Sequence, residues 1–132
     1  MQEIWKSKAR QWQKLESDPQ IKERLQQIME DPKELEEYFG SRLEFGTAGL
    51  RGEMGLGPNR MNNTVVHQTS LAIARYIKTF RDNPSVVIGY DARNNSDAFA
   101  QLAARVFSSE GVHVYFFAKI AATPLLAHTV VI

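Results

Sequence analysis

The segment that most restricts the possible fold is a short apolar run, SVVIGY, at residues 85–90. It lacks the alternation of apolar and polar side chains seen in a strand with one wet face, so it is typical of a strand buried on both faces of a parallel sheet. An apolar stripe at helical spacing follows within residues 99–107, and a second strand-like run, VHVYFF, occupies residues 112–117. Strand, helix and strand in this order predict an α/β fold with a right-handed crossover.

The chain before this unit continues the alternation of strands and helices. Apolar and charged side chains alternate over residues 42–45, as in a half-buried strand. Residues 63–80 carry apolar side chains three and four positions apart, which predicts a helix. The positions are Val66, Thr69, Ile73, Ile77 and Phe80. We therefore expect a three-layer βαβ unit with a mostly parallel sheet, three of whose strands lie in this sequence.

The first forty residues show a different pattern, that of short amphipathic helices. Asp18 and Asp31 each precede a proline, which puts a capping carboxylate just ahead of a helix start. Gly40 is well placed to end the last of these helices. We expect a helical N-terminal extension over residues 1–40 and an α/β domain over residues 41–132.

The composition excludes several classes of protein. Sixteen Lys and Arg against fifteen Asp and Glu give a formal net charge of +1, so no overall field attracts nucleic acid or an anionic membrane. The absence of cysteine excludes thiolate nucleophiles, disulfides and cysteine metal sites, and it favours a reducing compartment. The sequence contains neither a signal-peptide core nor an apolar stretch long enough to span a bilayer. We expect a cytoplasmic location without nucleic-acid or membrane partners.

Ligands of open parallel sheets bind at the loops that leave the carboxyl ends of the strands. Three loops qualify here, at residues 46–61, 91–97 and 118–123. None of them carries a Walker or dinucleotide-binding glycine fingerprint. The three histidines are too scattered for metal-ligand spacing, so we expect no metal site within these residues.

The first loop combines glycines with Thr47 and Arg51. Glycines such as Gly49 let backbone amides approach a ligand closely, while the threonine hydroxyl and the guanidinium donate hydrogen bonds suited to a tetrahedral anion. The combination suits a phosphate site. A glycine-rich turn in which Arg51 pairs with an acidic neighbour explains the same residues equally well.

The second loop begins with Asp91 and Arg93 directly after the buried strand. Arg93 either binds an anion or holds Asp91 in a structural ion pair, and arginines at strand ends often organise loops in the second way. Ser96 is expected as the N-cap of the next helix rather than as a nucleophile, because no histidine lies near it in the sequence.

The sequence LEFGTAGLRGEMGLGPNRMN at residues 43–62 resembles the N-terminal motif of the α-D-phosphohexomutases, in the form of their phosphoglucomutase and phosphopentomutase branch. VVIGYDARNNSDAFA, GVHVYFF and ATPLLAHTV match later segments of that family in order and spacing. The resemblance covers about residues 35–132 and is looser before them.

The resemblance implies the first of four α/β domains of a phosphoglucomutase-type enzyme. Such an enzyme interconverts glucose 1-phosphate and glucose 6-phosphate through an enzyme phosphoserine with Mg²⁺ and through glucose 1,6-bisphosphate, which is both activator and intermediate. By the family's pattern Thr47 and Arg51 would lie near the transferring phosphoryl group, and with Gly49, Asp91 and Arg93 from the loop analysis they form the expected phosphate-binding set. Arg51 is also implied as the catalytic group, because a permanently charged, forked guanidinium suits a transition state that spreads negative charge over several oxygens.

The sequence departs from the family in lacking its T-A-S-H-N-P phosphoserine loop and its D-G-D-x-D metal loop. We therefore expect a fragment of the first domain that is inactive by itself and self-associates through an open sheet edge. A phosphopentomutase or phosphomannomutase fragment is one alternative, and a stand-alone, non-catalytic phosphate-binding module is another. A Rossmann-like nucleotide binder is a third, against which the missing glycine fingerprint counts.

Overall fold

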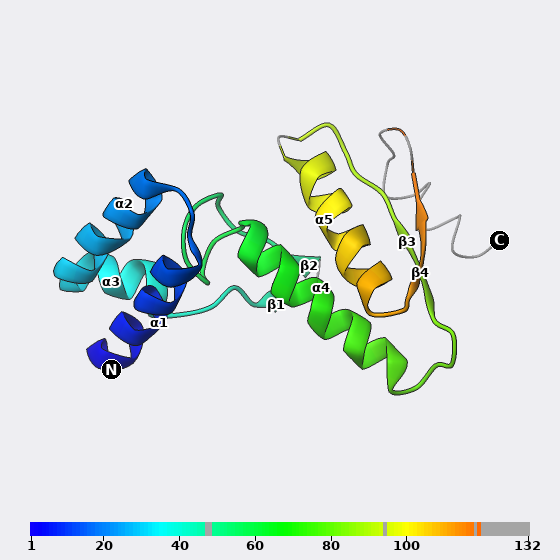
Figure 1. Cartoon of the computed structure of the whole chain (residues 1–132), viewed down its shortest axis with the longest axis horizontal. Helices are drawn as coiled ribbons and strands as arrows, with labels where there is room; N and C mark the ends of the chain where they lie inside the picture. The colour runs from blue at the N-terminus through cyan, green and yellow to red at the C-terminus, as the bar shows by residue number, and fades with distance from the viewer. Residues whose placement is uncertain (47–48, 94, 118, 120–132) are drawn as a thin grey trace. The chain divides into compact units, whose positions relative to one another are not determined.

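The structure is a computed structural model that describes residues 1–46, 49–93, 95–117 and 119 of the chain (Figure 1). The chain divides into two compact units, Met1–Asn62 and Asn63–Ile132. None of the helices in the described part of the chain combines the length and the apolarity that crossing a bilayer requires.

Three helices make up most of the first unit: α1 (Gln2–Leu15), α2 (Pro19–Glu30) and α3 (Pro32–Phe39). The side chain of Asp18 accepts a 2.9 Å hydrogen bond from the backbone N–H of Gln20 at the start of α2. Asp31 accepts one of the same length from Lys33 at the start of α3. Each cap satisfies a backbone donor that a helix start leaves unpaired. The predicted helix starts after the two aspartates are therefore confirmed.

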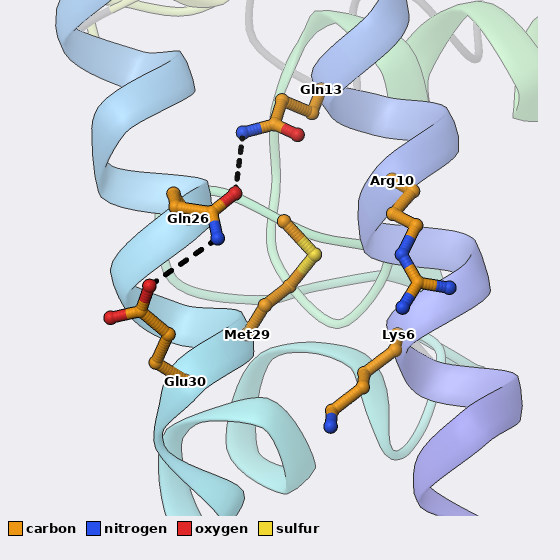
Figure 2. Close-up of a pocket in the computed structure, with 6 residues that line it drawn as sticks. All are labelled: Lys6, Arg10, Gln13, Gln26, Met29 and Glu30. Atoms are coloured by element: carbon orange, nitrogen blue, oxygen red, sulfur yellow. Dashed lines mark hydrogen bonds between the residues drawn. The ribbon is translucent and has the colours of Figure 1, made fainter.

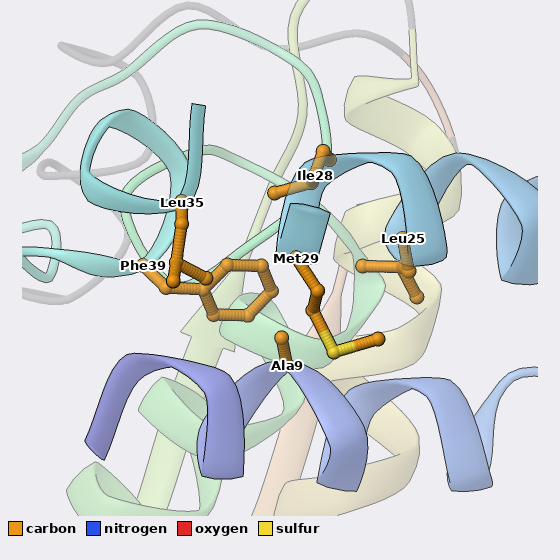
Figure 3. Packing of buried hydrophobic residues seen from close by; sticks show 6 residues of the cluster. All are labelled: Ala9, Leu25, Ile28, Met29, Leu35 and Phe39. Atoms are coloured by element: carbon orange, nitrogen blue, oxygen red, sulfur yellow. The ribbon is translucent and has the colours of Figure 1, made fainter. Parts of the chain in front are cut away.

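The core of the first unit lies between these three helices (Figure 3). Its buried members are Ala9, Leu25, Ile28, Met29, Leu35 and Phe39. Trp12 of α1 meets Phe39 of α3 edge to face, with ring centroids 6.0 Å apart, which is a favourable arrangement for two aromatic rings. Leu56, which lies in the glycine-rich loop, also packs against this core. The loop is thus attached to the helices by burial of an apolar side chain.

The strand expected at residues 42–45 is shorter and pairs differently. β1 (Phe45–Gly46) forms an antiparallel pair with β2 (Gly49–Leu50), with Phe45 opposite Leu50 and Gly46 opposite Gly49. Phe45 is 64% exposed, so the expectation of a half-buried strand is wrong for this segment. Alternation marks a strand without naming its partner, and the glycines of this loop allow the chain to pair with its own next residues.

The second unit contains helix α4 (Asn63–Lys78) and a strand, helix and strand: β3 (Ser85–Ile88), α5 (Ser96–Ser109) and β4 (His113–Phe116). β3 and β4 are parallel, with Ser85 opposite His113 and Ile88 opposite Phe116. The buried centre of the unit is formed by Ala74, Phe107 and Val112, against which residues of both strands pack. The α/β class with a parallel sheet and preceding helices is therefore confirmed.

Helix α4 buries a face next to the one that its larger side chains predict. Val65, Ser70 and Ala74 are its buried residues. Of the predicted stripe, Ile77 packs against the core, whereas Ile73 is 38% exposed. Phe80, expected on the buried stripe, follows the end of the helix and is 62% exposed. Small residues on the buried face let α4 pack closely against α5.

Candidate functional site

Arg51 directly follows β2, at the open end of the antiparallel pair. Its side chain is exposed, and no described residue forms a hydrogen bond or an ion pair with it. The alternative in which an acidic neighbour pairs with Arg51 therefore has no support in the described part of the chain. An exposed guanidinium without a carboxylate partner keeps its donors available to an anion.

The backbone that follows Arg51 is closely held. A Cβ atom added to Gly52 would lie 2.6 Å from Cδ2 of Leu43, so only glycine lets the chain pass here without displacing that leucine. The backbone carbonyl oxygen of Glu53 accepts a 2.7 Å hydrogen bond from the backbone N–H of Met61. These two contacts fix the direction in which the chain leaves Arg51.

Asp91 and Arg93 form a local ion pair in the second unit. Nε of Arg93 donates to Oδ2 of Asp91 over 2.8 Å, and the backbone N–H of Arg93 donates to Oδ1 over 3.0 Å. The two hydrogen bonds from Arg93, the backbone one foremost, lower the pKa of Asp91 below its ordinary value. Arg93 therefore holds Asp91 in an ion pair, as the structural alternative predicts. The Arg93 side chain is also 82% exposed, and it has further N–H donors.

Ser96 does not occupy the N-cap position expected for it. α5 begins at Ser96 itself, and the N-cap is Asn95 in the left-handed conformation, with φ of 65° and no side-chain cap. The Ser96 hydroxyl instead accepts a 3.2 Å hydrogen bond from the backbone N–H of Asp91. Asparagine tolerates the left-handed conformation before a helix. The Ser96 hydroxyl is then available to hydrogen-bond the loop backbone.

The predicted site residues are thus distributed over the chain. Gly49 and Arg51 belong to the first unit, whereas Asp91 and Arg93 lie together in the second. Thr47 lies outside the described residues, as does the loop at 118–123 apart from Lys119. The convergence of the three loops on one ligand stays a prediction.

A further arginine of the loop, Arg60, was not singled out from the sequence. Its Nη2 atom lies 2.8 Å from Oε1 of Glu37, and its Cζ lies 3.9 Å from the centre of the Tyr38 ring. The side chain is 12% exposed, and its buried Nη1 atom has no hydrogen-bond partner among the described residues. The N-R-M-N end of the loop motif was the signal, but the sequence does not reveal which helix the arginine would meet.

A hollow of about 420 Å³ lies between α1 and α2 (Figure 2). It is lined by Lys6, Arg10, Gln13, Gln26, Met29 and Glu30. Gln13 donates to Gln26 over 3.4 Å and Gln26 to Glu30 over 3.3 Å, so one wall is already a chain of hydrogen bonds. None of the described residues of the predicted loops lines it. Among the described residues, no three His, Asp or Glu side chains gather as metal ligands would.

Comparison with known proteins gives one family. Residues 42–131 match the model of the family described as Phosphoglucomutase/phosphomannomutase, alpha/beta/alpha domain I. The chain is 41% identical over 131 residues to a phosphopentomutase of Mus musculus, a match covering 91% of this chain and 21% of the relative. It is 43% identical over 95 residues to a phosphoglucomutase of Staphylococcus haemolyticus (strain JCSC1435), covering 72% of this chain and 17% of the relative.

A phosphopentomutase of Homo sapiens is 45% identical over 106 residues, covering 74% of this chain and 17% of the relative. The chain thus spans between 17% and 21% of the length of these curated relatives. No solved structure gives a significant match.

Proposed function

Since the chain belongs to the phosphoglucomutase and phosphomannomutase family of mutases, we propose that it supplies the phosphate-contacting first domain of an enzyme that interconverts glucose 1-phosphate and glucose 6-phosphate. The observation that carries this proposal is the exposed, unpaired state of Arg51 among the described residues, directly after β2 in the family motif. A guanidinium in that state binds a phosphoryl group without first having to leave a carboxylate.

Arg51 would act on the phosphoryl group in transit. The enzyme phosphoserine gives its phosphoryl group to the free hydroxyl of glucose 1-phosphate, and the proton of that hydroxyl goes to the serine oxygen. Glucose 1,6-bisphosphate then returns the phosphoryl group of position 1 to the serine, the serine hydroxyl proton passes to the sugar oxygen at position 1, and the sugar leaves as glucose 6-phosphate. In each transfer, negative charge develops on oxygens that the Arg51 donors can reach, and this stabilises the transition state.

The remaining predicted residues have supporting roles in the same proposal. Arg93 holds Asp91 through Nε, which leaves the outer nitrogens of its guanidinium for the phosphate of the substrate. Thr47 and the Gly49 backbone would supply neutral donors to the same group. Mg²⁺ belongs with the phosphoserine, and the D-G-D-x-D loop that would hold it does not occur in these residues. No step of this proposal is therefore assigned to metal ligands of this chain.

The names of the relatives do not agree on the sugar of the substrate. Two of those described above are named phosphopentomutases, so a pentose phosphate is the second candidate substrate. The loop that selects the sugar is not among these residues, and activity has to be measured with both sugars.

A coupled assay tests the proposal. The 132-residue chain should show no turnover of glucose 1-phosphate with glucose 1,6-bisphosphate and Mg²⁺, because nucleophile and metal loop are not in it. A fusion of the chain to the part of the Staphylococcus haemolyticus phosphoglucomutase that follows the matched region should turn over. Turnover by the chain alone, or none by a fusion whose circular dichroism shows it folded, would contradict the proposal. Ribose 1-phosphate is the parallel substrate.

A further inference from the structure

We infer that Arg60 is a positioning residue, which clamps the loop carrying Arg51 onto helix α3 and thereby aims Arg51 at the substrate phosphate. The inference rests on the proposed function of Arg51. In this inference the N-terminal helices, expected from the sequence only as an appended extension, help to position the site, because α3 holds the loop.

The clamp itself consists of two different contacts made by one side chain. Nη2 of Arg60 pairs with Glu37 over 2.8 Å, while the guanidinium lies over the Tyr38 ring, with Cζ 3.9 Å from the ring centre. A guanidinium can donate to a carboxylate from its edge while its planar face covers an aromatic ring, whereas an ammonium group has no such face. The Arg60 side chain is only 12% exposed, whereas that of Glu37 is 62% exposed, so solvent screens the ion pair more than the contact with the Tyr38 ring.

The part of the loop that Arg60 fixes is built closely around it. A Cβ on Gly55 would lie 2.7 Å from Cδ of Arg60, so the Gly55 backbone rests directly on the arginine stem. Gly57 has φ of 93°, which favours glycine, and any side chain there would collide with the carbonyl oxygen of Tyr38. The loop therefore follows the end of α3 at van der Waals distance.

Polar contacts hold the same stretch in one conformation. Nδ2 of Asn62 donates to the carbonyl oxygens of Gly55, Gly57 and Arg60 at 2.8, 2.9 and 3.2 Å. Asn59 donates from its side chain to the carbonyl oxygen of Glu37 over 3.4 Å. These hydrogen bonds join the loop residues to one another and to the last turn of α3.

Two links connect this piece to Arg51. The backbone N–H of Leu43 donates to the carbonyl oxygen of Pro58 over 2.9 Å, and the Leu43 side chain packs against Gly52, the residue after Arg51. The backbone N–H of Met61, next to Arg60, donates over 2.7 Å to the backbone carbonyl oxygen of Glu53, which lies two residues after Arg51. A displacement of Arg60 would therefore shift the backbone that aims Arg51, and small shifts of a positioning group reduce binding and rate strongly.

The chain offers a matched control for this role. Arg24 also lies in the first unit, forms an ion pair with a helical carboxylate (Glu34, 2.7 Å), and has its Cζ 5.8 Å from the same Tyr38 ring. No contact of Arg24 with the loop occurs among the hydrogen bonds and ion pairs of the described residues. Arg24→Lys thus removes a guanidinium from an ion pair and from the neighbourhood of the same ring without touching the loop, at a side chain that is 38% exposed.

The experiment is a titration of the ¹⁵N-labelled chain with glucose 1-phosphate, followed by the backbone amide shifts of residues 49–53. We expect Arg60→Lys to raise the Kd about fivefold or more, and Arg24→Lys to change it less than about twofold. In an Arg51→Ala background, Arg60→Lys should cause no further loss, because a positioning residue acts only through the group that it positions. Tyr38→Leu, which removes the ring from under the guanidinium, is the second variant and should behave as Arg60→Lys does.

Hydrogen exchange separates a failure of this inference from a failure of the proposed function. The amides of Gly55 and Met61 are hydrogen-bonded within the loop, and they should exchange faster in Arg60→Lys than in Arg24→Lys, with or without ligand. Equal exchange and equal Kd in these two variants would overturn the clamp, as would a loss from Arg60→Lys that adds to that of Arg51→Ala. Unchanged binding in Arg51→Ala, with faster exchange in Arg60→Lys, would instead overturn the proposed role of Arg51 and with it the positioning role.

Discussion

Three arginines of this chain show how the surroundings of one residue type decide its use. Arg51 is exposed and unpaired among the described residues, Arg93 is tied to Asp91, and Arg60 is held between Glu37 and Tyr38. The first can give all its donors to a ligand, the second some of them, and the third is committed to the protein. The sequence alone could place each of them in a loop but could not distinguish these states, because the partners Glu37 and Tyr38 are distant in sequence from Arg60.

A carboxylate in the second unit makes stability depend on pH. Nζ of Lys78 donates to Oε2 of Glu110 over 2.9 Å, and this hydrogen bond, with a smaller contribution from Arg75, lowers the pKa of Glu110 from its ordinary value of 4.5. Since the folded pKa is depressed, the stabilisation is present above the unfolded value and is lost as the pH falls through the folded one.

We predict that Glu110→Gln lowers the melting temperature at about pH 7 and that the difference from wild type shrinks towards about pH 3. Thermal unfolding followed by circular dichroism across this range measures it. Glu23→Gln, which changes an exposed carboxylate with no ion pair in the described part of the chain, is the control and should show no such convergence. A difference for Glu110→Gln that stays constant with pH would contradict the assignment.

At the scale of elements, local signals were sufficient where one segment decides its own structure. The aspartate and proline pairs start α2 and α3, and the apolar runs at 85–90 and 112–117 contain β3 and β4. The pairing of β1 was wrong because strand partners are chosen by tertiary contacts that alternation does not encode. The buried face of α4 was predicted only in part, through Ile77, because close helix packing also selected Ser70 and Ala74 over bulkier neighbours.

The packing of α1, α2 and α3 into one core gives a stability prediction with an internal control. Leu25 is 1% exposed, whereas Leu15 is 85% exposed. Leu25→Ala should reduce the free energy of unfolding of the first unit by about 2–5 kcal/mol, and Leu15→Ala by less than about 0.5 kcal/mol. Urea unfolding followed by tryptophan fluorescence reports this unit, since both tryptophans lie in α1. Equal effects of the two substitutions would contradict the core described here.

At the scale of the whole molecule, family membership and the fold of each unit rest on independent observations. The family match spans 42–131 and therefore crosses the boundary between the two compact units after Asn62. The predicted division into residues 1–40 and 41–132 stays a prediction. So does self-association, although Tyr115 and Phe116 on β4 are 57% and 39% exposed and offer apolar surface to a neighbour.

The central claim is that Arg51, in the loop after β2, binds a sugar phosphate. The most direct test measures the affinity of Arg51 variants for glucose 1-phosphate. Titration of the ¹⁵N-labelled chain with glucose 1-phosphate should shift the amides around Arg51 and saturate in the millimolar range, about −4 kcal/mol of binding free energy. Arg51→Ala should raise the Kd about tenfold, Arg51→Lys should raise it less, and Arg81→Ala, at an exposed arginine outside the predicted loops, should leave it unchanged. Binding by Arg51→Ala with the affinity of the wild-type chain would contradict the account.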